Sequence, residues 1–333
     1  MNQNAQPPAR LLRIKLSTSF PHWPLARQTP HGDGVWGGCH FFINQPVEAC
    51  DAWFVYDGLT APDQTSCPES SVIFVTAEPA SFKRYDSSWL QQFAHVLSCQ
   101  SQIQHRSLHQ TQTGLPWFVP KDYATLKAET LPAKTKLLSA ITSDKTTTLG
   151  HRTRLDFIRA LQAAIPEMDV FGRGLKPLEN KADGLLPYRY SVAIENSQFP
   201  DYWTEKAADC FLCGTVPLYH GCPNLANYFP PESFISIEIA RDRWPETIGK
   251  IQSLLCEGEE NYARHGAALD TAKQAVLNQH NLFAVLASFV ERLNLESPRR
   301  IIRLAPEPTP SYWSRKLLKW RRVIQRTGIT SCS

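Results

Sequence analysis

The sequence predicts an α/β protein with two domains, for three reasons. Its 333 residues are too many for one ordinary core and suit two domains of about 150 residues each. With 42% hydrophobic and 20% charged residues, it has the composition of a folded protein rather than a disordered one. Predicted strands alternate with predicted helices along much of the chain, and this alternation favours parallel sheets.

The N-terminal part contains three short apolar runs that are typical of strands, at residues 10–17, 51–58 and 71–79, followed by a helix-like run at 87–99. Between the first two strands, residues 22–46 are rich in Gly, His and Trp and show little periodicity. This stretch would either line a cleft or form a plain surface loop, and the sequence leaves both readings open.

A second series of elements begins after a Pro- and Lys-rich stretch near Pro132. It consists of a strand at 136–142, an amphipathic helix at 152–165 and a strand at 168–172. The change in composition indicates a domain boundary around residues 120–135. We therefore expect one domain at 1–130, a second at 131–298 and a C-terminal tail at 299–333.

The cysteines and glycines argue against two kinds of cofactor site. The nine cysteines are scattered, and Cys210 and Cys213 fall inside a predicted helix without a second pair, so buried reduced thiols are expected rather than zinc. The "FGRG" at 171–174 lacks both the third Gly and the downstream acid of a dinucleotide fingerprint. We expect neither a metal nor a nicotinamide cofactor.

The positive charge of the chain belongs to its tail. Residues 299–333 hold nine basic residues and one acid, so this +8 leaves −4 for the remainder of a chain whose net charge is +4. A nucleic-acid protein usually carries its basic patch on the folded body, so a nucleic-acid partner is not expected.

A second property of the tail is its amphipathic pattern. In "SYWSRKLLKWRRVIQR" (311–326), apolar residues recur at helical spacing among six cations and no acid. Such a helix suits peripheral contact with an anionic membrane, and the alternative is that it packs on the protein body. The N-terminus lacks the features of a signal peptide, and no run reaches the ~18 apolar residues of a membrane span. We expect a cytoplasmic protein, peripheral at the inner face of the membrane.

The segment 188–224 concentrates polar side chains between a predicted strand at 190–195 and a predicted helix at about 203–213. Asp201 is a plausible N-cap for that helix, Gly214 would end it, and "TVPLY" would form the next strand. In the resulting β-α-β unit, the loop after the first strand lies at the carboxyl edge of the sheet, where open α/β sheets bind ligands. The polar residues expected there are Asn196, Tyr202, Glu205 and Lys206.

These residue types suit a sugar nucleotide. The free N–H groups of a helix N-terminus, together with the Lys206 ammonium, favour a phosphate. Glu205 would bind ribose hydroxyls, Tyr202 an adjacent ring or phosphate oxygen, and Asn196 either group. The alternative is that Glu205 and Lys206 are first-turn helix charges in solvent, as most such pairs are.

The longer segment resembles the α-1,3/α-1,4-fucosyltransferases, glycosyltransferase family ten. The resemblance lies in "YRYSVAIENS", "DYWTEK" and "GTVPLYHGCPN", followed by "YFPPESFISI", with the spacing of the family's donor motif kept over about 50 residues. Arg189 and Tyr190 replace the family's usual Lys and Phe. The residues 22–46 have no counterpart that we can align.

The resemblance extends more weakly upstream. "TSDKTTTLGHRTRLDFIRAL" is similar to the family's strand end and Arg-led helix, which implies that Arg154 binds the pyrophosphate. "FVTAEPASF" is similar to the strand of bacterial members that ends in a Glu proposed as catalytic base, which here is Glu78.

What the resemblance implies is a GT-B fold, with two Rossmann-like domains facing across a cleft. It implies an inverting transferase that moves fucose from GDP-fucose to a glycan hydroxyl, with α-1,3 linkage and an acceptor that is lipid-linked if the tail binds a membrane. Because the chain contains no Asp-x-Asp pair to hold a metal on the diphosphate, cationic side chains would do that work. The alternatives are a transferase for another GDP-linked sugar and a non-catalytic sugar-nucleotide-binding module.

Overall fold

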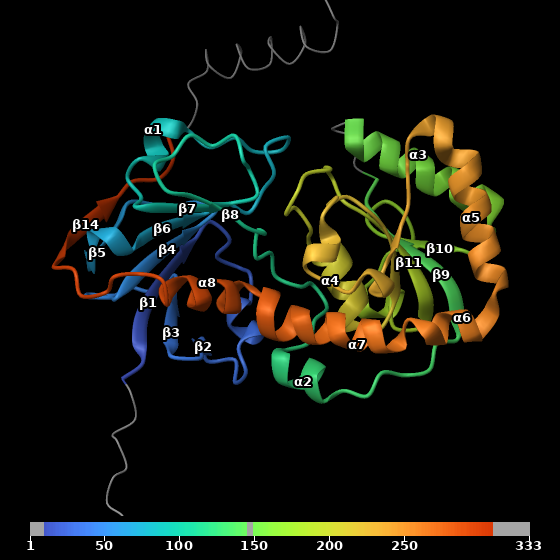
Figure 1. Ribbon diagram of the computed structural model, residues 1–333, viewed down its shortest axis with the longest axis horizontal. Helices are drawn as coiled ribbons and strands as arrows, with labels where there is room; N and C mark the ends of the chain where they lie inside the picture. The colour runs from blue at the N-terminus through green and yellow to red at the C-terminus, as the bar shows by residue number, and fades with distance from the viewer. Residues whose placement is uncertain (1–9, 145–148, 309–333) are drawn as a thin grey trace, which may run out of the picture.

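The computed structural model describes residues 10–144 and 149–308. Each half of the chain builds one large sheet, and these two sheets lie side by side with helices around them (Figure 1). Within the described residues, a third sheet has only two strands, β14 and β5. The N-terminal sheet has the order β2-β3-β1-β4-β6-β7-β8, and the C-terminal sheet has the order β10-β9-β11-β12-β13. Every pair in these two sheets is parallel except β2 with β3.

The elements of the N-terminal half are β1 (Leu12–Thr18), β2 (Val35–Trp36), β3 (Cys39–Ile43), β4 (Ala52–Tyr56), β5 (Asp63–Pro68), β6 (Val72–Val75), α1 (Ser87–Leu90), β7 (His95–Ser98), β8 (Leu108–Gln110) and α2 (Tyr123–Ala128). Those that follow are β9 (Lys136–Ile141), α3 (Leu149–Ala164), β10 (Asp169–Phe171), β11 (Tyr188–Ile194), α4 (Glu205–Leu212), β12 (Val216–His220), β13 (Ile235–Ser236), α5 (Trp244–Cys256), α6 (Gly258–Arg264), α7 (Gly266–Ala275), α8 (Leu282–Val290) and β14 (Arg299–Leu304).

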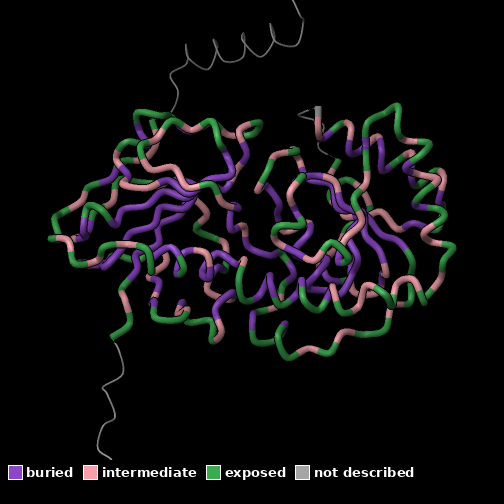
Figure 2. The backbone as a smooth tube through the Cα atoms, viewed as in Figure 1, coloured by how far each residue is buried: buried purple, intermediate pink, exposed green. Residues whose placement is uncertain are grey.

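The N-terminal sheet is buried on both faces, as parallel sheets are (Figure 2). Side chains alternate along β4, so Phe54 and Tyr56 join the cluster that α8 covers, whereas Trp53 and Val55 join the cluster on the other face. Helix α8 has the sequence "LFAVLASFV", and most of its apolar side chains are buried against the sheet. The central strands are therefore rigid supports for the side chains at their ends.

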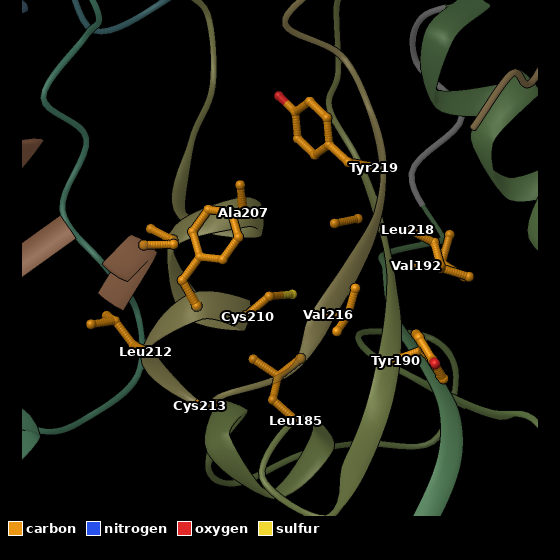
Figure 3. Packing of buried hydrophobic residues seen from close by; sticks show 14 of the residues in the cluster. Leu185, Tyr190, Val192, Ala207, Cys210, Leu212, Cys213, Val216, Leu218 and Tyr219 are labelled. Atoms are coloured by element: carbon orange, nitrogen blue, oxygen red, sulfur yellow. The ribbon is translucent and has the colours of Figure 1, made fainter. Parts of the chain in front are cut away.

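The C-terminal core packs α4 against β11 and β12. Figure 3 shows Cys210 of α4 pointing toward Val216 of β12, among the buried residues of this cluster. Gly214 forms the turn after α4, where its φ of +61° suits glycine, and a Cβ there would come within 2.5 Å of the Leu131 side chain. This packing holds α4 against the two strands.

The chain returns to the N-terminal sheet after α7. Helix α8 packs on that sheet, and β14 pairs antiparallel with β5 (Figure 1). The expected domain bounds and the expected tail from residue 299 do not anticipate this return, because α8 is apolar enough to fit either core and β14 is short and basic. The amphipathic helix expected at 311–326 lies outside the described residues.

Most predicted elements are confirmed, including the strands near 10–17, 51–58, 71–79 and 136–142. The helix expected at 87–99 is wrong, since α1 ends at Leu90 and residues 95–98 form β7 between β6 and β8. Sheet pairing on both sides of β7 outweighs the local helical pattern there. The stretch 22–46 is also more than a loop, because it contains β3, which pairs with β1.

Seven of the eight described cysteines are buried free thiols, and Cys256 is exposed. Among residues 10–144 and 149–308, no helix is both long enough and apolar enough to cross a membrane. No group of three or more His, Cys, Asp or Glu side chains in that same part of the chain is arranged to hold a metal ion.

Candidate active site

Helix α4, which carries two of the expected donor-binding residues, begins at Thr204. The Thr204 hydroxyl caps the helix by accepting a hydrogen bond from the Lys206 backbone N–H at 3.3 Å. The Glu195 carboxylate in turn holds Thr204, accepting from its backbone N–H at 2.9 Å and from its hydroxyl at 2.8 Å. The start of the helix is thus tied to the end of β11.

The expected cap, Asp201, has a different role. Its backbone is left-handed, with φ of +61°, and its carboxylate accepts hydrogen bonds from Asn224 Nδ2 and the Tyr228 hydroxyl, each at 2.7 Å. The prediction that Asp201 caps α4 is therefore wrong, because the turn at 201 directs its side chain to a neighbouring loop instead of the helix. The loop between β11 and α4 (residues 195–204), which we call the donor loop, is anchored at two points, by Glu195 and by Asp201.

The Lys206 ammonium lies next to two carboxylates and is not free in solvent. Its ammonium is 3.2 Å from Glu195 Oε2 and 3.4 Å from Glu205 Oε1, and its side chain is only 18% exposed. Burial alone would lower the pKa of Lys206, but the two carboxylates raise it above its ordinary value. The alternative of a solvated helix charge does not describe this residue, which stays protonated in a partly desolvated position.

Glu205 is held by two ammonium groups. Lys206 lies on one side, and on the other the Lys181 ammonium is 3.9 Å from Glu205 and 2.7 Å from the fully buried Asp209. Burial would raise the pKa of Glu205, but Lys206 and Lys181 lower it to about 2. Glu205 is therefore an ionised acceptor that can receive hydrogen bonds from hydroxyl groups.

Arg154 and Asn196 meet where β9 and β11 lie next to each other. Arg154 Nη1 donates to Asn196 Oδ1 at 2.6 Å, so helix α3 and the loop after β11 are joined at this point. Arg154 is only 6% exposed, and its Nε has no hydrogen-bond partner among the described residues. Burial lowers the pKa of Arg154, which nonetheless remains a cation with an unused donor.

Tyr202 is buried and interacts with Arg154, Glu195 and Glu78. It is 1% exposed, and burial raises the pKa of its hydroxyl, with Glu195 and Glu78 as the next contributors. The involvement of Glu78 links the donor loop to the N-terminal sheet. Tyr202 is thus a neutral side chain that feels carboxylates from both halves of the molecule.

Glu78 follows β6, as expected for a residue at the carboxyl edge of the N-terminal sheet. Burial raises the pKa of Glu78 to about 7, and the Asp57 carboxylate adds to this shift. Lys206 opposes the shift and Glu205 reinforces it, so these two residues of α4 act on Glu78 from the other half of the chain. A carboxylate with a pKa near 7 is suited to accept a proton at neutral pH.

The six expected site residues therefore collect on two facing edges. Five lie at the carboxyl edge of the C-terminal sheet, and Glu78 lies at the carboxyl edge of the other sheet. The Ser81 and Ser197 hydroxyls, from the two loops concerned, are within hydrogen-bonding distance of each other. What the arrangement offers chemically is cationic and amide donors for an anion, an ionised carboxylate for hydroxyls, and a carboxylate base opposite them.

A known protein family matches the part of the chain that holds the five residues of the C-terminal edge. Residues 131–267 match the family model described as "Glycosyltransferase family 10 (fucosyltransferase) C-term". The chain carries a glycosyltransferase family 10 domain. That domain includes β9 to α6 and thus Arg154, Asn196, Tyr202, Glu205 and Lys206.

Curated relatives match shorter stretches of the chain. An alpha-(1,3)-fucosyltransferase of Helicobacter pylori is 37% identical over 60 residues, which are 18% of this chain and 13% of that protein. A human 4-galactosyl-N-acetylglucosaminide 3-alpha-L-fucosyltransferase is 34% identical over 114 residues, 32% of this chain and 30% of that protein. The chain thus spans less than a third of the length of these relatives.

A solved structure resembles the whole molecule. The crystal structure of an alpha1,3-fucosyltransferase with GDP-fucose covers 89% of this chain and 94% of its own, with a TM-score of 0.52 and 17% sequence identity. At this identity the likeness concerns the fold, and it confirms the expected GT-B arrangement of two α/β domains.

Sequence reasoning about the family 10 domain missed Glu195, which organises the donor loop. Glu195 is 3% exposed and bonds Thr204 and Lys206, while Gly221 leaves room for it, since a Cβ at 221 would lie 2.4 Å from Glu195 Cγ. The signal in the sequence was an acid closing an apolar strand, "SVAIE", next to two further charges. A buried acid at a strand end needs a partner, and Lys206 is the cation near enough to serve.

Proposed function

We propose that the protein is an inverting glycosyltransferase that moves fucose from GDP-fucose to a hydroxyl of an acceptor glycan by a single displacement. The observation that carries the proposal is the opposition of Glu78, whose pKa is raised to about 7, to the cationic edge formed by Arg154 and Lys206. An inverting transfer needs a base for the acceptor hydroxyl and positive charge for the departing diphosphate. The family 10 domain supports fucose as the sugar.

The donor would lie along the carboxyl edge of the C-terminal sheet. We call this edge, with Arg154, Asn196, Tyr202, Glu205 and Lys206, the donor edge. The Arg154 guanidinium and the Lys206 ammonium would bind the diphosphate, with the N–H groups at the start of α4. Asn196 and Tyr202 would bind oxygen atoms between them. Glu205 would accept hydrogen bonds from the ribose.

The guanine base has space beyond Glu205. A cavity of about 620 Å³ is lined by Phe118, Leu175 and Lys181, and Lys181 also lies 3.9 Å from Glu205. A planar base bound between the Phe118 ring and the loop after β10 would leave its ribose near Glu205. The nucleotide would then run along the sheet edge from the base at Phe118, through the ribose at Glu205, to the diphosphate at Arg154.

The reaction then follows from the positions of the groups. The acceptor glycan would approach from the N-terminal half, where Glu78 takes the proton from the attacking hydroxyl. That oxygen bonds to the anomeric carbon of fucose from the face opposite the diphosphate, so the bond to GDP breaks with inversion. The cations of the donor edge stabilise the charge that GDP carries away, and we propose that no divalent metal is required.

Two further candidates use the same edge. Another GDP-linked sugar would fit the diphosphate and ribose contacts equally well, because none of them touches the sugar itself. A non-catalytic sugar-nucleotide-binding module would keep the donor edge but would have no need of Glu78. A linkage of the α-1,3 type, a lipid-linked acceptor and contact of residues 311–326 with an anionic membrane are also proposals.

The decisive experiment replaces Glu78 by Gln, which keeps the shape of the side chain and removes its basicity. The donor is first identified by incubating the protein with a panel of GDP-sugars and acceptor glycans, with mass detection of transferred or hydrolysed sugar. Glu78→Gln should lower transfer about 10² to 10⁴-fold while GDP affinity, measured by calorimetry, stays near that of the wild type.

The matched control is Glu69→Gln, at the opposite end of β6, where the carboxylate is 69% exposed. It should leave transfer unchanged. Near-normal turnover of Glu78→Gln would exclude Glu78 as the base. GDP binding without any transfer or hydrolysis in the wild type would favour the binding module.

A further inference from the structure

Asp57 ends β4 in a conformation that a non-glycine residue rarely adopts. Its φ is +64°, and its backbone N–H donates to the Val75 carbonyl at 2.8 Å, so the ends of β4 and β6 are joined immediately before Glu78. A left-handed backbone at such a residue is strained and persists only where the surroundings enforce it. The side chain of Asp57 shows what those surroundings are.

Three side chains donate hydrogen bonds to the Asp57 carboxylate, and two of them come from the loop that follows Glu78. The Tyr85 hydroxyl donates to Oδ1 at 2.6 Å, and the Lys83 ammonium and the Ser19 hydroxyl each donate to Oδ2 at 3.1 Å. Lys83 also donates to the Asp57 carbonyl at 2.8 Å. The loop 79–86 is therefore closed over Asp57 at its far end.

The near end of this loop is held as well. Gln100, which is 3% exposed, donates through Nε2 to the Glu78 carbonyl at 2.7 Å and to the Lys83 carbonyl at 3.0 Å. Between the two anchors, Ser81 meets Ser197 of the donor loop. The loop that begins at Glu78 thus joins the strand ends of one half to the donor loop of the other.

We propose that Asp57 is a positioning residue for the Glu78 carboxylate, acting through the loop 79–86 that Lys83 and Tyr85 tie to it. This inference rests on the proposed function, in which Glu78 is the base. Asp57 does not touch the reacting atoms. It fixes the far end of the loop and contributes to the charge that surrounds Glu78.

The charged groups that act on Glu78 come from several elements. Besides burial, Asp57 after β4 and Glu205 on α4 raise its pKa, whereas Lys206 on α4 and Lys83 in the loop lower it. The hydroxyls of Tyr56 and Tyr202 and the thiol of Cys99 also interact with Glu78. Removing the Asp57 charge withdraws a group that raises the pKa and also frees Lys83, so both consequences make Glu78 easier to deprotonate.

The test measures kcat and donor KM against pH for the full-length Asp57→Asn protein. The acid limb of kcat should move to lower pH by roughly one unit. The plateau should fall roughly tenfold because the base is weaker and less well held. The KM for GDP-fucose should stay unchanged.

Asp51→Asn is a closely matched control. Asp51 precedes β4 at its opposite end, its side chain is 8% exposed like that of Asp57, and it pairs with Arg10 and Arg299. Its acid limb should coincide with that of the wild type. An unmoved limb in Asp57→Asn, or an equal movement in Asp51→Asn, overturns the proposal.

Lys83→Met keeps the proposal testable if Asp57→Asn does not fold. It leaves the Asp57 charge without its cation and should move the acid limb to higher pH, which a merely structural role would not do. An unmoved limb again overturns the proposal. If Glu78→Gln abolishes transfer while these limbs stay in place, only the role of Asp57 fails; if Glu78→Gln is active, the proposed base fails with it.

Discussion

The two facing edges of the molecule obtain their charged side chains in different ways. At the C-terminal edge, Glu195, Glu205 and Lys206 come from one stretch of twelve residues, and Lys181 and Asp209 continue the network. At the N-terminal edge, Asp57, Glu78 and Lys83 come from strand ends and a loop, with Gln100 from beyond the next strand. The first edge is a paired network in one β-α-β unit with Lys181 added from the turn before it, whereas the second is assembled by the sheet.

This difference has a functional consequence. In the donor edge the ammonium groups of Lys206 and Lys181 lie beside the carboxylates of Glu195, Glu205 and Asp209. The pKa of Lys206 is raised and that of Glu205 is lowered, so these two groups stay ionised, and the network restricts their positions. Burial raises the pKa of Glu78 to about 7, and two carboxylates and two ammonium groups act on it in opposite directions. A binding edge benefits from fixed charge, whereas a base must gain and lose a proton.

The strongest way to break the donor edge is Glu195→Gln. It removes the buried carboxylate that holds both Thr204 and Lys206, and breaking a buried ion pair commonly costs about 3–5 kcal/mol. Urea unfolding should show a correspondingly lower free energy of unfolding. The control is Glu246→Gln, an exposed partner of Lys250, which should leave the midpoint in place; an equal effect of both variants would contradict a structural role for Glu195.

Lys206→Ala should affect binding more than folding. Loss of a charge-assisted contact to a partly desolvated diphosphate should weaken GDP binding by about 2 kcal/mol or more, which is about 30-fold. Calorimetry with GDP measures this directly. Lys250→Ala, on an exposed helix face, is the control, and GDP affinity unchanged in Lys206→Ala would remove the residue from the donor site.

The pH dependence of the wild type sharpens the contrast between the edges. Because the pKa of Glu78 is raised to about 7 and the base acts deprotonated, kcat should fall about tenfold per pH unit below 7. The KM for GDP-fucose should not follow this limb, because the pKa of Glu205 is lowered to about 2, that of Lys206 is raised, and a diphosphate esterified at both ends does not titrate in this range. A KM for GDP-fucose that rises as kcat falls between pH 7 and pH 5 would refute the separation of the two edges.

The smallest expected effect is that of a chelator. If Arg154 and Lys206 neutralise the diphosphate, transfer should continue at its full rate in excess EDTA. The measurement is turnover before and after chelation, with Mn²⁺ or Mg²⁺ added back. Activity that disappears and is restored by either metal would show that the cations of the donor edge are not sufficient.

Much of the donor edge could be predicted from the sequence because its contacts are local. The spacing of Glu205 and Lys206 from the strand end predicted their place at the start of α4, and this is where they lie. Asn196 and Tyr202 follow from the same unit. The cap was missed because the left-handed backbone at Asp201 depends on Asn224 and Tyr228, which come later in the chain.

The sequence by itself determined the parallel α/β character of both halves, the β-α-β unit and the position of Glu78 after a buried strand. These depend on apolar periodicity and on neighbours within a few residues. Only the tertiary structure decided that α8 returns to the first sheet and β14 pairs with β5, that residues 95–98 form a strand, and that Asp57 and Gln100 hold the loop of Glu78. Those outcomes depend on the free energy of pairing and burial between distant segments, which a local pattern does not contain.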